Sequence, residues 1–143
     1  MNNANKFFIS GYASVFNNQD DKGDIVLPSA FNPENINLNR IKFLYNHNQK
    51  AVIGKIEEVQ KDSYGLFIKA SIDADTSGLS QRVIKCISSR LLNGLSIGYI
   101  ARQTQKDKTF NRRFIHSLDL REISVVQKPS NPKTTIIWQG IGR

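Results

Sequence analysis

The chain has 143 residues, 39% of them hydrophobic, which is enough to bury a core without disulfides or structural metals. Its formal net charge of +8 is compatible with a nucleic-acid or acidic partner, but Lys and Arg occur singly or in pairs, as at Arg112-Arg113. The composition therefore disfavours specific nucleic-acid binding, and it predicts a single domain over residues 1–143.

Nothing in the sequence predicts export or a membrane span. Residues 1–6 are polar and asparagine-rich, so they lack the apolar centre of a secretory signal. No apolar run approaches the roughly 18 residues that a spanning helix requires. The single cysteine, Cys86, cannot form an internal disulfide. We therefore expect a soluble protein of a reducing, cytoplasmic compartment.

The first half of the chain predicts strands separated by polar turns. Aromatic and β-branched residues dominate 7–16, where Gly11 marks an expected bulge or close backbone approach. Prolines and asparagines then break the chain into a loop-rich stretch with short apolar runs. The predicted strands are 7–16, 51–60 and 65–73, of which the last two have the spacing of a β-hairpin, and the loop-rich stretch between 16 and 51 holds apolar runs at 25–27 and 41–45.

Between residues 76 and 93 the apolar residues recur every three or four positions, which predicts one amphipathic helix. Asp75 or Thr76 can cap its start, and Asn93-Gly94 supplies a stop signal. We interpret Cys86 as a small buried hydrophobe rather than a nucleophile, because it lies on the apolar face. The residues of that face are Leu79, Val83, Cys86, Ile87 and Leu91.

After the helix, strands are predicted at 95–102, 113–126 and 134–138, with a polar loop over 103–111. Two prolines within 128–132 separate the last strand from the one before it. Without repeated strand–helix alternation, these elements predict an α+β, mainly β fold. We expect six to eight mostly antiparallel strands in a partly closed barrel, with the 76–93 helix packed on it.

The pentapeptide Gly94-Leu95-Ser96-Ile97-Gly98 places a hydroxyl between two glycines, which let a substrate backbone approach. A serine is a weak nucleophile and needs a neighbouring base. The elbow of α/β-hydrolases has the same pattern, but there a strand precedes the serine and a helix follows it, the reverse of the order here. The alternative without chemistry is that Gly94 ends the helix in a left-handed conformation and Ser96 is an ordinary strand residue.

Only two histidines are available as a base, His47 and His116. His47 directly follows an apolar strand, where its imidazole can take the Ser96 proton and return it to a leaving amine. Glu122 is the favoured third member, because a carboxylate within an apolar strand is costly to bury unpaired. His116 is the alternative third member if no bulge intervenes, since alternation would place it on the Glu122 face. The competing interpretations are that His47 is a solvated loop histidine and that Glu122 belongs to a structural ion pair.

Several further blocks accompany these residues in a fixed order. They are residues 11–16, 24, 28–31, 45–48, 52–54, 93–99, 119–126 and 129–132. Together, over about residues 8 to 135, they resemble the tailed-phage prohead protease family, which is distantly similar to herpesvirus assemblin. The resemblance implies an assemblin-like barrel with Ser96 as nucleophile, His47 as base and Glu122 as acid, and it implies no metal or cofactor.

The function implied is a serine endopeptidase of capsid maturation. Its substrates would be the scaffold segment of a major capsid protein or a separate scaffold protein, and the chain itself. It would act as a homodimer inside an immature capsid in the bacterial cytoplasm, and the short chain fits a self-cleaved or gene transfer agent form. The loop after the Glu122 strand, at Ser130 and Asn131, is our candidate for the oxyanion donors.

Two other function classes stay open on sequence grounds. A non-catalytic capsid- or scaffold-binding module of the same fold would be expected to lack one triad position. A basic nucleic-acid-binding domain would show clustered Lys and Arg and binding that falls steeply with salt.

Overall fold

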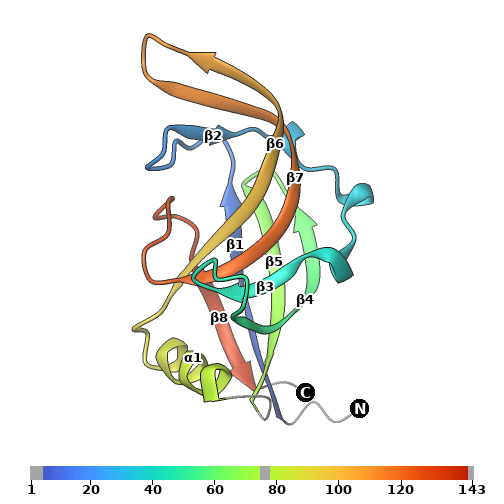
Figure 1. The fold of residues 1–143 in the computed structure, drawn as a ribbon, viewed down its shortest axis with the longest axis vertical. Helices are drawn as coiled ribbons and strands as arrows, with labels where there is room; N and C mark the ends of the chain where they lie inside the picture. Colours follow the sequence, from blue (N-terminus) through green and yellow to red (C-terminus); the bar gives the residue numbers. More distant parts are fainter. Residues whose placement is uncertain (1–4, 75–77, 142–143) are drawn as a thin grey trace.

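The computed structural model describes residues 5–74 and 78–141. These residues form an eight-stranded, strongly curved sheet with one α-helix at its lower end, and a long hairpin projects at the opposite end (Figure 1). Three single-turn 3₁₀ helices occupy the loop-rich stretch, at Pro28–Ala30, Pro33–Asn35 and Leu38–Arg40. The other elements are β1 (Lys6–Val15), β2 (Asp24–Val26), β3 (Lys42–Tyr45), β4 (Val52–Lys61), β5 (Gly65–Asp73), α1 (Gly78–Ser88), β6 (Gly94–Asp107), β7 (Arg112–Val126) and β8 (Ile136–Ile141).

The sheet follows the order β2-β7-β3-β4-β5-β1-β8, and β6 pairs with β7 off this path. All neighbouring strands are antiparallel except that β7 runs parallel to both β2 and β3. A bridge between Gly94 and Thr135 links the start of β6 to the segment before β8. The N–H of Leu95 reinforces this link by donating to the carbonyl of Thr134 at 2.8 Å. The predicted mainly β, partly closed barrel is therefore confirmed.

The apolar faces of the strands fill the inside of the curved sheet, as strand alternation predicts. Leu66, Ile68 and Ile72 of β5 are fully buried there, and Val83 and Ile87 of α1 join the same core. The expected irregularity at Gly11 is also present, because the pairing of β1 with β8 shifts between Ser10 and Gly11. A Cβ atom at Gly11 would lie 2.2 Å from the carbonyl oxygen of Thr135, so the close approach requires glycine.

The helix is shorter than the predicted range 76–93. It runs over Gly78–Ser88, and the expected capping residues 75 and 76 lie outside the described residues. Its end is set by Arg90, which has a left-handed φ of 65°, rather than by Asn93-Gly94. Leu91 is consequently 77% exposed and not on the apolar face. Cys86 packs partly buried against the core, as expected.

The prediction of a loop over 103–111 is wrong. Strand β6 continues to Asp107, and only residues 108–111 form the turn. This segment extends past the core, so both of its faces meet solvent and its sequence shows no apolar alternation. Its backbone is satisfied by pairing with β7 as far as Asp107 and Arg112. Across the described residues, no helix is both long and apolar enough to cross a membrane.

Candidate active site

Strands β6 and β7 bring the predicted site residues into register. Ser96 pairs with Ser124, and Gly98 pairs with Glu122. Residues two positions apart on a strand share a face, so the side chains of Ser96, Ser124 and Glu122 lie together. Their neighbour β3 runs parallel to β7 and ends at Tyr45, opposite Val125. The turn after β3 therefore begins at the edge of this face.

That turn carries His47 in an uncommon backbone conformation. Asn46 and His47 both have left-handed φ angles, of 54° and 60°, which few residues other than glycine adopt. Strand β7 holds the turn: the N–H of Asn46 donates to the carbonyl of Val125 at 2.9 Å, and the N–H of His47 donates to Oγ of Ser124 at 3.0 Å. These contacts with β7 fix the position of the imidazole relative to Glu122.

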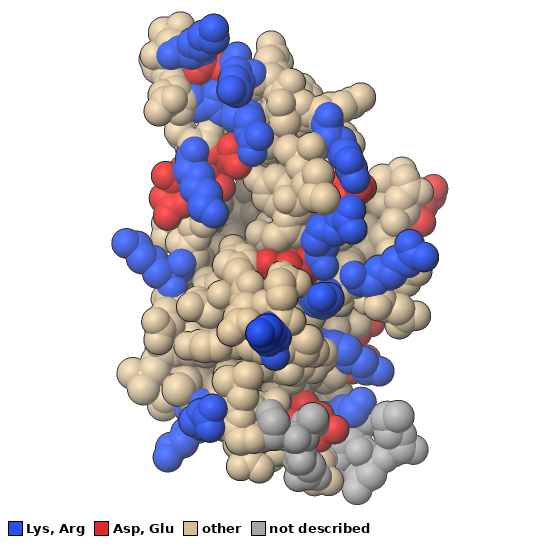
Figure 2. All heavy atoms as spheres, in the orientation of Figure 1, with Lys and Arg blue, Asp and Glu red and all other residues tan. Residues whose placement is uncertain are grey.

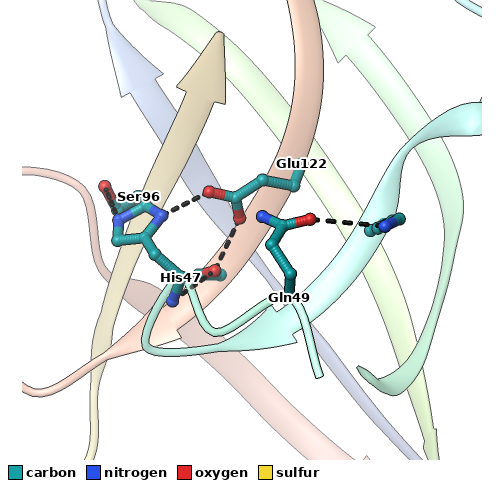
Figure 3. Close-up of polar contacts among 6 residues, drawn as sticks. His47, Gln49, Ser96 and Glu122 are labelled. Atoms are coloured by element: carbon teal, nitrogen blue, oxygen red, sulfur yellow. Dashed lines mark hydrogen bonds and ion pairs between the residues drawn. The ribbon is translucent and has the colours of Figure 1, made fainter. Parts of the chain in front are cut away.

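Ser96, His47 and Glu122 form one hydrogen-bonded chain (Figure 3), and Ser124 extends it at the Glu122 end. Oγ of Ser96 lies 3.0 Å from Nε2 of His47. Nδ1 of the same ring is hydrogen-bonded to Oε1 of Glu122. The hydroxyl of Ser124 donates to the other carboxylate oxygen, Oε2, at 2.6 Å. A hydrogen on Nδ1 bound to Glu122 leaves Nε2 as an acceptor toward Ser96.

Burial increases from one end of this chain to the other. The His47 side chain is 42% exposed, whereas that of Glu122 is 6% exposed and Ser124 is fully buried. A buried carboxylate must be hydrogen-bonded on both oxygens to avoid a large desolvation cost. Glu122 meets this condition through His47 and Ser124. Ser96 is partly exposed at one end, whereas the Glu122 carboxylate at the other is protected from water.

The two glycines that flank Ser96 are required by space. A Cβ atom at Gly98 would lie 2.2 Å from Oε1 of Glu122, and one at Gly94 would lie 2.7 Å from Cδ of Pro129. Gly94 opens β6 and is not in a left-handed conformation, so the interpretation of Gly94 as a helix terminator is wrong. The pentapeptide instead packs against the carboxylate on one side and the 128–131 loop on the other.

A cleft of about 530 Å³ opens beside Ser96 and His47. The expected oxyanion residues Ser130 and Asn131 line it, together with Tyr99 and Arg113. The Asn131 side-chain oxygen accepts from the Asn18 amide at 2.9 Å and from the N–H of Lys133 at 3.0 Å, which fixes the loop. Within the described part of the chain, no hydrogen bond uses the backbone N–H of Ser130 or Asn131.

An ionic network forms the cleft wall farther from Ser96. Arg113 donates to both carboxylate oxygens of Asp24 at 3.0 Å, and the Tyr99 hydroxyl donates to Oδ2 at 2.9 Å. Burial acts to raise the pKa of Asp24, but the hydrogen bonds from Arg113 and Tyr99 outweigh it and lower this pKa. Burial and the bond to Asp24 raise the pKa of Tyr99. The network is therefore charged on Asp24 and Arg113 and neutral on Tyr99 at pH 7.

His116 does not join the site. It lines a separate cavity, and its backbone carbonyl accepts from the Ser29 hydroxyl at 3.0 Å. The β6–β7 pairing skips one β7 residue between Glu122 and Leu120, and another at His116 itself. These bulges break the alternation on which the alternative depended. Six residues of strand also separate His116 from Glu122, roughly 20 Å.

Ser124 is the site residue that the sequence analysis missed. Its hydroxyl is bonded to Glu122, and it accepts the N–H of His47. The available signal was the same-face spacing of Glu122 and Ser124 in a predicted strand. Across the described residues, no group of three or more His, Cys, Asp or Glu side chains is placed to hold a metal ion.

Comparisons with known proteins agree on one family. The sequence profile of the caudovirus prohead serine proteases matches residues 1–140. The prohead protease of enterobacteria phage HK97 is 33% identical over 129 residues, covering 88% of this chain and 57% of that protein. The prohead protease of Escherichia phage T5 is 28% identical over 130 residues, covering 89% and 60%. The chain thus spans less than two thirds of the length of either relative.

Solved structures of similar fold come from herpesviruses. The KSHV protease in complex with a hexapeptide phosphonate inhibitor has a TM-score of 0.59 at 12% identity, covering 94% of this chain and 65% of that one. The varicella-zoster virus protease has a TM-score of 0.51 at 12% identity, covering 92% and 63%. At this identity the likeness establishes the fold alone, and it bears out the assemblin-like architecture expected from sequence.

Proposed function

Because the chain belongs to the caudovirus prohead serine protease family, we propose that it is a serine endopeptidase with Ser96, His47 and Glu122 as its catalytic triad. One observation carries the proposal: Ser96 and Glu122 contact the two ring nitrogens of His47, on opposite sides of the ring. This arrangement matches the general requirement of a nucleophile, a base and an orienting group in hydrogen-bond reach.

In the proposed reaction, Oγ of Ser96 attacks the carbonyl carbon of the scissile peptide bond while Nε2 of His47 takes the hydroxyl proton. The imidazolium returns this proton to the leaving amine, and an acyl-enzyme remains on Ser96. Water then attacks the acyl group with His47 again as base, which releases the acid and restores the serine. Glu122 stabilises the imidazolium and holds the tautomer, without accepting the proton itself.

The negative charge that develops on the carbonyl oxygen needs N–H donors. We assign them to the backbone amides of Ser130 and Asn131, which line the same cleft as Ser96. The flanking residues Pro129 and Pro132 have no N–H, so Ser130 and Asn131 supply the backbone donors at the centre of the loop. Packing of Pro129 against Gly94 supports the position of this loop relative to β6.

The names of the relatives suggest the biological setting. For this chain the proposed substrates are the scaffold segment of a major capsid protein or a separate scaffold protein, cut inside an immature capsid in the host cytoplasm. Function as a homodimer is part of the same proposal. The hydrogen-bonded triad speaks against a non-catalytic binding module, for which loss of one of these side chains would be expected.

The test is covalent labelling and peptide cleavage by the purified chain. A fluorophosphonate probe should label wild type at Ser96, identified by mass spectrometry, and a proteome-derived peptide mixture should be cut. Ser96→Ala should lose both while remaining folded, because it removes one oxygen atom. Ser63→Ala, in the exposed β4–β5 turn, serves as the matched control and should behave as wild type. Undiminished cleavage by folded Ser96→Ala would refute the proposal.

A further inference from the structure

The hairpin formed by the far ends of β6 and β7 projects beyond the rest of the sheet (Figure 1). Lys and Arg side chains gather over it in the space-filling view (Figure 2). No apolar core accounts for this extension, because Phe110 at its turn is 66% exposed and most of its β6 residues face solvent. The hairpin therefore presents a charged, exposed surface to which a partner can bind.

Three lysines at this end of the molecule have no ion-pair partner among the described residues. They are Lys22, Lys106 and Lys108. The neighbouring arginines are already engaged, since Arg112 pairs with Asp107 at 2.9 Å and Arg113 pairs with Asp24 at 3.0 Å. The unneutralised positive charge of the hairpin therefore resides on Lys106 and Lys108, while Lys22 beside them helps to lower the pKa of Asp24.

The pairing of the hairpin does not explain this charge. Lys106 stands directly opposite Arg113 in the β6–β7 register, and like charges at opposed positions disfavour a strand pair. The tip is stiffened in another way, because the Arg112 guanidinium lies over the rings of both Phe110 and Phe114, at 4.9 and 5.2 Å from their centroids. A stiff element that carries unneutralised lysines is suited to binding carboxylates.

The lysine surface is continuous with the active-site cleft. A hollow of about 550 Å³ is lined by all three lysines. Lys22, Asp24 and Arg113 line both this hollow and the cleft that holds Ser96. Along β6, the cleft wall runs from Ser96 to Ala101, and Lys106 in the hollow is ten positions beyond Ser96. An extended peptide, at roughly 3.3 Å per residue, would therefore need about five residues to leave the cleft and about ten to reach Lys106.

We propose that Lys22, Lys106 and Lys108 form an exosite that binds acidic side chains of the polypeptide substrate, about five to ten residues from the bond that Ser96 attacks. This inference rests on the proposed protease function and names a substrate class for it: polypeptides with an acidic segment near the cleavage site. Lysines suit this task because an ammonium on a flexible stem can follow carboxylates at variable positions.

A protein segment fits this surface better than a nucleic acid does. Single-stranded nucleic acid binds where aromatic rings are free to stack with bases. At the hairpin tip, the Arg112 guanidinium already lies over both the Phe110 and the Phe114 ring, and Phe114 is only partly exposed. The hollow at the hairpin is also continuous with the Ser96 cleft, whose proposed substrate is a polypeptide.

The experiment profiles cleavage sites in a proteome-derived peptide mixture by mass spectrometry. Wild type should show Asp and Glu enriched about five to ten residues from the cut bond, on one side only. Lys106→Gln/Lys108→Gln should lose this enrichment. The matched control Arg82→Gln/Lys85→Gln removes the same charge from α1, at the other end of the molecule (Figure 1), and should keep the enrichment.

A pair of peptides then tests the charge directly. For a cleaved acidic peptide, kcat/KM should fall about three- to tenfold in Lys106→Gln/Lys108→Gln, as expected for exposed ion pairs. Its counterpart with Gln in place of each Glu should respond less than about twofold. The difference should shrink at 1 M salt, where charges more than about 3 Å apart are screened.

Distinct outcomes separate this inference from the protease proposal. Cleavage by wild type without acidic enrichment, or enrichment that survives Lys106→Gln/Lys108→Gln, overturns the exosite and leaves the protease intact. If Lys106→Gln/Lys108→Gln leaves cleavage unchanged but abolishes binding of a single-stranded DNA oligonucleotide, the exosite is also overturned, in favour of a nucleic-acid site. If wild type cuts nothing, fluorescence anisotropy measures the binding of a labelled glutamate-rich peptide to Ser96→Ala. Weaker binding when Lys106→Gln/Lys108→Gln is added to this variant supports the exosite. Unchanged binding refutes it.

Discussion

The carboxylate of Glu122 lies against Gly98 on the neighbouring strand, so closely that a Cβ atom at position 98 would stand 2.2 Å from Oε1. Because the two residues are paired in the β6–β7 register, neither backbone can move away without breaking the ladder. The second glycine of the pentapeptide therefore provides the room in which the carboxylate meets His47.

Replacement of Gly98 by Ala should displace the Glu122 carboxylate and disconnect it from His47. Loss of the orienting group should lower kcat by about a hundredfold or more, in line with the cost of a wrong imidazole tautomer. Thermal unfolding and turnover of the same preparation separate the site effect from general instability. Gly78→Ala is the control, since a Cβ there meets only the flexible end of Arg82 at 3.3 Å; equal turnover in both variants would contradict the role given to Gly98.

The sequence pointed to the three residues of the proposed triad, which the structure brings into contact, because their signals are local. Ser96 between glycines, His47 at a strand end and Glu122 in an apolar strand each stand out in the sequence, and the amphipathic strands follow the two-residue period. The bulges at Arg121 and His116 were not predictable, since they depend on the pairing of β7 with β6. The helix end at Arg90 was equally hidden, because a left-handed arginine has no sequence signature comparable to that of glycine.

The two histidines should differ sharply in their contribution to turnover. His47→Ala removes the ring that contacts Ser96 and Glu122, and we expect a loss comparable to that of Ser96→Ala. The double variant Ser96→Ala/His47→Ala should be hardly worse, because residues that act as one unit are not additive. His116→Ala should retain near wild-type kcat/KM in the same peptide assay, and selective inactivation by His116→Ala would show that the wrong base has been identified.

Ser124 should act as a positioning residue. Ser124→Ala removes the donor to Oε2 of Glu122 and the acceptor for the N–H of His47, in a fully buried position. Two buried groups lose a partner, so the free energy of unfolding should fall by about 1–3 kcal/mol. Turnover should fall as well, chiefly in kcat, because the imidazole is less well held while the cleft that binds substrate is intact.

Denaturant unfolding and steady-state kinetics of Ser124→Ala measure these two effects separately. A purely structural serine would lower stability and leave kcat of the folded fraction unchanged. Ser71→Ala is a suitable comparison, because Ser71 is also buried on a strand and also donates to a glutamate, Glu57, but does not line the cleft that holds Ser96. Equal kcat values for the Ser124 and Ser71 variants would argue against positioning.

The Asp24–Arg113 pair should make the free energy of unfolding depend on pH in the acidic range. Hydrogen bonds from Arg113 and Tyr99 lower the pKa of Asp24 against the opposing effect of burial, so the folded state binds fewer protons than the unfolded state. The stabilisation is therefore complete above the unfolded value of about 3.9 and is lost as pH falls through the lower, folded value. Burial raises the pKa of nearby Asp20, which gives the opposite dependence, so wild type must be compared with a variant of Asp24 itself.

Asp24→Asn should lower the free energy of unfolding at pH 7 by about 1–3 kcal/mol, because it leaves the Arg113 guanidinium without its charged partner in a partly buried site. The gap between wild type and Asp24→Asn should narrow steadily below about pH 4, and urea unfolding across pH 2 to 7 measures it. Asp119→Asn breaks an ion pair whose side chains are about half exposed, 51% and 48%, and should cost at most about 0.5–1 kcal/mol. A gap for Asp24→Asn that is the same at pH 2 and pH 7 would show that Asp24 stabilises this wall of the cleft through its shape and not through its charge.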